Sequence, residues 1–199
     1  IYVQSIGQNY NSVSQAQITL PSFTSPGDLL ILSLITPQTR SITSITDPIN
    51  GNSYNLAKVT NIGSWGTLYT YSVTNSLGGG PITVTINLNG TAATLNVSFL
   101  EFGGIAMAGP KDQDSAGNMP PGTAMSSGSQ TTTQATELIY GFGAGDYSCH
   151  SNAPYIEREI ANGWCAVSRN VSATGSYSVT ATQTSSGNWA LQMVTFKGA

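Results

Sequence analysis

Residues 81–102 read PITVTINLNGTAATLNVSFLEF, and their alternation of apolar and polar side chains decides the fold class. Positions 82, 84, 86 and 88 are apolar and the residues between them are polar, which is the period of a half-buried β-strand. Asn89-Gly90 is the preferred two-residue hairpin turn, because both of its positions take positive φ. The stretch therefore predicts a β-hairpin that turns at Asn89-Gly90 and pairs Leu88 with Thr91.

The same period recurs along the rest of the chain. Residues 25–36, SPGDLLILSLIT, predict a turn followed by a strand that is apolar on both faces and hence central in its sheet. Similar short strands are expected in WGTLYTYSVT, ELIYGFG, GWCAVS, GSYSVTAT and NWALQMVTFK, and no segment combines helical periodicity with capping residues. The pattern predicts an all-β, two-sheet sandwich, jelly-roll-like, with ten or more short antiparallel strands.

The length of 199 residues fits one all-β domain. We expect an N-terminal strand over residues 1–10 and a single sandwich domain over residues 11–199. Residues 103–136 are rich in Gly, Ser, Thr and Pro and predict a long polar loop, which would wrap the surface, add an irregular edge strand or contact a partner. No repeat of 20–50 residues is apparent.

Charged residues make up only 8% of the chain, against roughly 25% in ordinary soluble proteins. Six basic and nine acidic residues give a net charge of −3 without a basic patch, which argues against nucleic-acid binding. No apolar run is long enough to span a bilayer. Because few groups titrate, we expect a fold that tolerates acid.

The chain starts at Ile1 and carries no recognisable leader, which we interpret as a mature or trimmed form of a secreted protein. The even cysteine count then predicts a disulfide between Cys149 and Cys165, worth about 3 kcal/mol, with two buried free thiols as the alternative. Three N-x-S/T sequons predict N-linked glycans, on Asn89, Asn96 and Asn170. An extracellular location follows from these features.

The sequence offers little for catalysis or metal binding. His150 is the only histidine and no G-x-S-x-G motif occurs, so neither a Ser–His nucleophile nor a His/Cys metal site is expected. Residues 112–118, DQDSAGN, have Asp112 and Asp114 at calcium-loop spacing, but Ala116 stands at the third ligand position. We predict no metal, no cofactor and no enzymatic activity.

One enzymatic alternative involves Glu101, which shares a strand face with apolar residues and would have a raised pKa if buried. The size and low charge are similar to those of acid-acting glutamic peptidases, which are β-sandwiches with a catalytic Glu and Gln. The chain lacks the Trp-rich motif of that family, so an acid hydrolase using Glu101 ranks third among the functions considered.

A second alternative is glycan binding. Trp65, Tyr69 and Tyr71 alternate along one strand face and could stack on sugar rings, although in a sandwich such a row is more simply core.

The first ten residues, IYVQSIGQNY, carry apolar side chains on both faces. Such a strand either belongs to its own sheet or leaves its domain and completes the sheet of a second subunit, as in strand addition. With its apparent leader processing, low charge, strands throughout and sequons, the chain resembles subunits of the extracellular threads of thermoacidophilic archaea. It is similar, more distantly, to archaeal bundling pili built by donor-strand exchange.

This resemblance implies that the N-terminal strand inserts into a neighbouring subunit, with Ile1, Tyr2, Val3, Gln4, Ser5 and Ile6 as the donor residues. We therefore expect a structural subunit that polymerises head to tail with copies of itself into a surface filament. The alternative is a secreted, monomeric adhesin or glycan-binding module in which the strand folds back.

Overall fold

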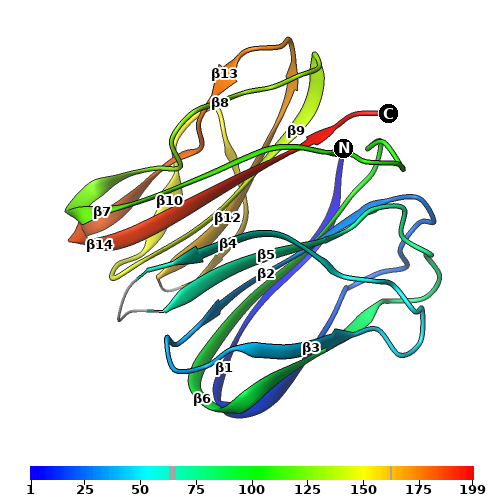
Figure 1. Cartoon of the computed structure of the whole chain (residues 1–199), viewed down its shortest axis with the longest axis horizontal. Helices are drawn as coiled ribbons and strands as arrows, with labels where there is room; N and C mark the ends of the chain where they lie inside the picture. The colour runs from blue at the N-terminus through cyan, green and yellow to red at the C-terminus, as the bar shows by residue number, and fades with distance from the viewer. Residues whose placement is uncertain (63–65, 162) are drawn as a thin grey trace. The chain divides into compact units, whose positions relative to one another are not determined.

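In the computed structural model of the chain, which describes residues 1–62, 66–161 and 163–199, every regular element is a β-strand (Figure 1). The all-β class predicted from the sequence is confirmed, and most strands lie in two six-stranded antiparallel sheets. The chain was expected to form one domain over residues 11–199. It divides instead into two compact units, Ile1–Ala108 and Gly109–Ala199, each with one of these sheets.

The described residues of the first unit form six strands. They are β1 (Tyr2–Thr19), β2 (Leu29–Thr36), β3 (Ile42–Thr46), β4 (Asn55–Asn61), β5 (Thr67–Val73) and β6 (Thr83–Phe102). Their order in the sheet is β1-β6-β2-β5-β4, and β3 pairs with the remaining edge of β6. The apolar run of β2 is buried along its length, as expected for a strand between two neighbours.

The hairpin predicted at Asn89-Gly90 is wrong. Residues 83–102 form the single long strand β6, and β1 pairs with it on both sides of this dipeptide. Val13 lies opposite Ala92 and Gln15 lies opposite Asn87, so residues 88–91 bulge out against one residue of β1. Pairing with a strand more than 60 residues away in sequence thus overrides the local turn preference of Asn-Gly.

At this bulge the two long strands curve together (Figure 1), and buried residues from before and after it share one core. That core includes Ile18, Val84 and Ile86 from one side and Leu95, Val97 and Phe99 from the other. The first unit therefore has a hydrophobic core of its own.

In the second unit, apart from residue 162, the chain forms eight strands. They are β7 (Lys111–Ser126), β8 (Gln130–Thr131), β9 (Thr136–Gly145), β10 (Cys149–Ser151), β11 (Ile156–Ala161), β12 (Trp164–Ser172), β13 (Ser176–Tyr177) and β14 (Thr180–Lys197). The large sheet has the order β7-β14-β9-β12-β11, with β10 also paired to β14. Residues 111–126 and 130–131 of the predicted loop over residues 103–136 form β7 and β8, held by backbone pairing to β14 and β13 despite their polar sequence. Of the forms expected for this segment, the irregular edge strand is the one that β7 takes.

The two units repeat one topology. Replacing β1, β6, β2, β5, β4 and β3 by β7, β14, β9, β12, β11 and β10 converts the strand order of the first sheet into that of the second. The irregularities repeat as well, because the large bulge between β1 and β6 recurs between β7 and β14, where Gly122 faces Gly187 and Ala124 faces Thr182.

Two smaller bulges also recur. The edge strands β4 and β11 each carry one extra residue, Ala57 and Arg158, at equivalent positions. The outer strands β1 and β7 each carry one near their start, before Gln4 and before Asp114. This repeat, about 100 residues long, lies outside the 20–50-residue range in which none was seen in the sequence.

Candidate functional site: carboxyl clusters at the first strand of each unit

Strand β1 has two halves that are held differently. The break between them lies at Ser12, which has a positive φ of 54°, and at the bulge before Gln15. After the break, Ala16 and Ile18 are fully buried. Before it, Ile6, Tyr10 and Val13 only partly cover the core.

The N-terminal half of β1 forms an edge of its sheet, paired on one side with β6. Ile1, which precedes β1, is held by a hydrogen bond of 2.5 Å from its nitrogen to the Gly103 carbonyl. The side chains of Ile1 and Val3 are 78% and 47% exposed. Of the six residues expected to act as a donor strand, only Gln4 is buried.

Gln4 joins this half of β1 to a buried carboxyl group. Its Nε2 donates to Glu101 Oε2 at 2.5 Å and to the Ser22 carbonyl at 3.2 Å, and its Oε1 accepts from the Ser22 nitrogen at 2.8 Å. Glu101 Oε1 accepts from the Ser25 nitrogen at 3.0 Å. The pair therefore fastens β1 to β6 and to the segment before β2.

Glu101 has a second carboxyl group beside it. Burial raises the pKa of Glu101; the hydrogen bonds from Gln4 and Ser25 lower it, and the facing carboxyl of Asp28 raises it further. The net effect is a raised pKa.

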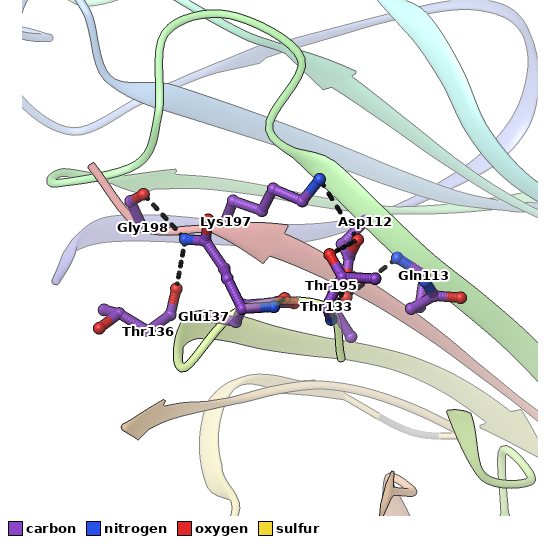
Figure 2. Close-up of polar contacts among 9 residues, drawn as sticks. Asp112, Gln113, Thr133, Thr136, Glu137, Thr195, Lys197 and Gly198 are labelled. Carbon is purple, nitrogen blue, oxygen red and sulfur yellow. Dashed lines mark hydrogen bonds and ion pairs between the residues drawn. The ribbon is translucent and has the colours of Figure 1, made fainter. Parts of the chain in front are cut away.

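The second unit has a related cluster at the equivalent place (Figure 2). Asp112, at the start of β7, accepts from the Thr133 nitrogen at 2.7 Å and from the Thr133 hydroxyl at 2.6 Å. Lys197, at the end of β14, lies 3.4 Å from the same carboxylate. Glu137, at the start of β9, is buried and accepts from the Gln134 nitrogen at 3.3 Å.

The pKa values of the two acids in this cluster are shifted in opposite directions. Burial raises the pKa of Asp112, but the hydrogen bonds from Thr133, Glu137 and Lys197 outweigh it, so that the pKa is lowered. Burial and the facing Asp112 raise the pKa of Glu137, against hydrogen bonds from Thr195 and Gln134 that lower it. The two carboxyl groups are therefore coupled, with the pKa of Asp112 lowered, that of Glu137 raised and Lys197 beside Asp112.

The sequence predicted Glu101 as a buried carboxyl but missed Gln4 as its partner. Together they form the Glu and Gln pair that the acid-peptidase alternative requires. Glu101 is fully buried, however, and both of its oxygens accept hydrogen bonds from the protein. In this geometry the pair acts as a cross-link between strands, with no surface that a substrate could reach.

The predicted disulfide is confirmed. Cys149 and Cys165 are bonded, with 5.5 Å between their Cα atoms, and join β10 to β12 inside the core of the second unit. Of the three sequon residues, Asn89 and Asn170 are exposed and Asn96 is half-buried, so glycosylation at these sites stays a prediction.

The faint calcium-loop pattern is not gathered into a ligand set. Asp112 contacts Lys197, whereas Asp114 pairs with Lys111 at 2.8 Å. Within residues 1–62, 66–161 and 163–199, no group of three or more His, Cys, Asp or Glu side chains could hold a metal ion.

The aromatic row on β5 lies beside a shallow pocket. Tyr69 and Tyr71 stack with their ring centroids 6.2 Å apart, whereas Trp65 lies outside the described residues. A pocket of about 190 Å³ is lined by Tyr71, Tyr54 and residues 42–45 of β3. The buried hydroxyl of Tyr54 has no hydrogen-bond partner in the part of the chain that the structure describes.

Comparison with known proteins assigns no family. No protein-family model matches the chain, and no curated protein matches it. A search for helices able to cross a membrane finds none among the described residues.

Proposed function

We propose that this protein is a structural subunit of an extracellular filament, and that residues 1–11 insert as a donor strand into the sheet of a neighbouring copy. The observation that carries the proposal is the division of β1 at Ser12 into a half that fills the core and a half that only partly covers it. Such a break is a natural hinge, because positive φ at a non-glycine residue costs roughly 1–2 kcal/mol and marks a strained point of the backbone.

The acceptor would be the edge of β6 along residues 95–102. Without the N-terminal half of β1, this edge presents an unpaired row of backbone groups and lacks the cover that Ile6 and Tyr10 give Leu95, Val97 and Phe99. The same half-strand from a second copy restores every one of these contacts, since an exchanged element is identical to the one it replaces.

Exchange of this kind leads to a polymer. Eleven extended residues reach about 36 Å at ~3.3 Å each, which is enough to lie along the whole edge. Each copy would give one strand and accept one, so the contact is head to tail and does not close on itself unless the geometry makes a ring. An extracellular site for the filament is supported by the disulfide and by the two exposed sequons.

Electron microscopy of the secreted chain beside a variant lacking residues 1–11 tests the proposal. We expect thin fibres and detergent-resistant multimers from the full chain only. A synthetic peptide of residues 1–11 added to the shortened variant should bind its open edge and give a stable monomer, which separates loss of the connector from loss of folding. Discrete monomers of the full chain at every concentration would contradict the proposal.

One observation favours a second function, which is binding of a neutral saccharide. The Tyr54 hydroxyl is buried without a partner beside an uncharged pocket that also contains Tyr71 and the hydroxyl groups of Thr43 and Ser44. Aromatic rings and hydroxyl groups are the usual partners of sugars, and a buried tyrosine hydroxyl normally has a hydrogen bond.

Retention on polysaccharide columns tests this alternative. The Y54F variant removes only the hydroxyl, so it should lose retention while it keeps or gains stability. Equal retention of the wild type and Y54F would exclude this pocket as the sugar site.

A further inference from the structure

We propose that the side chains of Lys197 and Asp112 join in an intramolecular amide bond, which covalently links the last strand of the second unit to its first, with Glu137 as the proton carrier. The three residues lie on the neighbouring strands β14, β7 and β9, with β14 in the middle (Figure 2). The bond lies within one chain, so its formation does not depend on the filament.

Strand pairing places the Lys197 amine between two carboxyl groups. Lys197 lies directly opposite Glu137 in the pairing of β14 with β9, and its backbone nitrogen donates to the Pro110 carbonyl at 2.7 Å, just before β7. Directly opposite residues carry their side chains on one face of a sheet, with Cβ atoms about 5 Å apart. On the other side, the Lys197 ammonium lies 3.4 Å from Asp112 Oδ1. The amine therefore has a carboxyl group on the strand to each side of it.

The carboxyl group of Asp112 is fixed in position and shielded from water. Its side chain is 3% exposed, and its two oxygens accept from the nitrogen and the hydroxyl of Thr133 at 2.7 and 2.6 Å. Glu137 is fully buried as well, and its Oε1 accepts from the Gln134 nitrogen. Groups that are held about 3–3.5 Å apart in a fixed orientation react far faster than the same groups free in solution. Lys197 and Asp112 meet this condition.

The reaction is a dehydration that needs no external reagent. The Lys197 ammonium first passes a proton through Glu137 to the Asp112 carboxylate, which gives a neutral amine and a neutral acid. The electron pair of Nζ then attacks Cγ of Asp112 and forms the C–N bond. A second proton moves from Nζ through Glu137 to the Asp112 hydroxyl, the C–O bond breaks, and one water molecule leaves. Burial and the facing Asp112 raise the pKa of Glu137, which suits a group that both gives and takes protons near neutral pH.

The first unit lacks the amine. Gly103 stands where Lys197 stands in the second unit, because each follows a phenylalanine that pairs with the equivalent leucine of the next strand, Phe102 with Leu29 and Phe196 with Leu138. The bond would thus fix β7 in its unit and leave β1 able to exchange. This last consequence rests on the proposed function.

The mass of the intact chain tests the bond. The chain is produced in a host that adds no N-glycans, kept folded until its mass no longer changes, and then reduced and denatured. We expect a mass lower than that of the sequence by one water molecule. Trypsin should release residues 112–158 and 170–199 as one cross-linked species. Cleavage after Lys111 provides an internal control, because the ion pair of Lys111 with Asp114 is 39% and 29% exposed and should not react.

Three variants assign the roles, with circular dichroism to check that each is folded. K197R keeps the cation without a nucleophilic amine, D112A removes the acceptor, and E137Q cannot carry the proton, so each should keep the full mass of its sequence. A wild-type chain of full mass would overturn the proposal. Loss of water that persists in D112A would make Glu137 the acceptor and overturn the assignment of Asp112, and loss of water from E137Q at the wild-type rate would remove Glu137 from the reaction.

The bond and the filament fail separately. Because the mass is measured on denatured single chains, a dehydrated chain that never forms multimers would keep the bond and remove the filament. Multimers built from chains of full mass would keep the filament and remove the bond. Chains that have not reacted keep the ion pair of Lys197 with Asp112, and the effects of this counter-ion on stability refer to them.

Discussion

Gly103 and Lys197 occupy equivalent positions in the two units, directly after the paired phenylalanines Phe102 and Phe196. A Cβ atom on residue 103 would lie 3.3 Å from Asp28 Oδ1, and the Lys197 ammonium lies 3.4 Å from the Asp112 carboxylate. In the second unit the Lys197 ammonium therefore stands beside Asp112, whereas in the first unit the Ile1 nitrogen donates to the Gly103 carbonyl.

Replacing Lys197 should destabilise the second unit. In K197Q the carboxylate of Asp112 keeps Thr133 but loses its counter-ion, so the free energy of unfolding should fall by roughly 1–3 kcal/mol at pH 7. The loss should shrink near pH 4, where the acid pair holds more protons. Urea denaturation at both pH values measures this, with the Lys58→Gln variant, at a half-buried lysine of the first unit, as control. An equal loss at both pH values would argue against the counter-ion role.

The stability of the whole chain should be highest in mild acid. The pKa values of Glu101 and Glu137 are raised in the folded state, so their contribution is fully present below the unfolded value near 4.5 and is lost as the pH rises through the folded pKa. The pKa of Asp112 is lowered, so its contribution is present above the unfolded value near 3.8 and is lost as the pH falls through the folded pKa.

Urea midpoints measured from pH 3 to pH 8 check this profile. We expect a maximum near pH 4–5 and a shallower decline toward pH 8 in E101Q. A midpoint that rises steadily up to pH 8 would show that other groups dominate the pH dependence of stability. Such a profile would give the acid tolerance expected from the low charge a specific origin in Glu101 and Glu137.

The positive φ of Ser12 predicts that glycine at this position makes the folded chain more stable. Ser12 has φ of 54°, which glycine adopts without strain, so S12G should stabilise the chain by up to about 1 kcal/mol. The matched variant S14G lies two residues away without a positive φ and should instead destabilise by about 0.5–1 kcal/mol. Thermal unfolding of both variants measures the difference, and equal losses in the two would show that Ser12 is not strained.

Reduction of Cys149–Cys165 should weaken the second unit. The bond closes a loop of 16 residues, for which the chain-entropy account gives about 3 kcal/mol. Urea midpoints with and without reductant measure this. The double variant C149A/C165A should be insensitive to reductant, and a wild type that is equally insensitive would contradict the prediction.

The local sequence pattern was sufficient to predict most strands and the disulfide, but it was not sufficient to predict how the long strands pair. Asn89-Gly90 has the composition of a hairpin turn, yet β1 pairs across it and makes it a bulge. Residues 111–126 lack strand propensity and form β7 because β14 offers an edge to pair with. Both errors come from contacts between residues far apart in the chain.

Only part of the candidate site could be predicted from the sequence. Glu101 stood out as a lone carboxylate in an apolar run, whereas Gln4 and Asp28 are ordinary polar residues whose roles depend on the fold. The equivalence of Gly103 and Lys197 could not be found either, because the two units share strand order and bulges and little recognisable sequence.

The most direct test of strand exchange is a disulfide trap between Asn9 and Asn96, which lie opposite each other on β1 and β6. In N9C/N96C, exchange between copies predicts a covalent ladder of multimers on a denaturing, non-reducing gel, collapsing to monomer with reductant. The pair Q15C/N87C lies beyond the hinge, where Gln15 bonds to Asn87 at 2.8 Å, and should cross-link only within one chain. A single monomer band from N9C/N96C, fully cross-linked within the chain, would contradict the account.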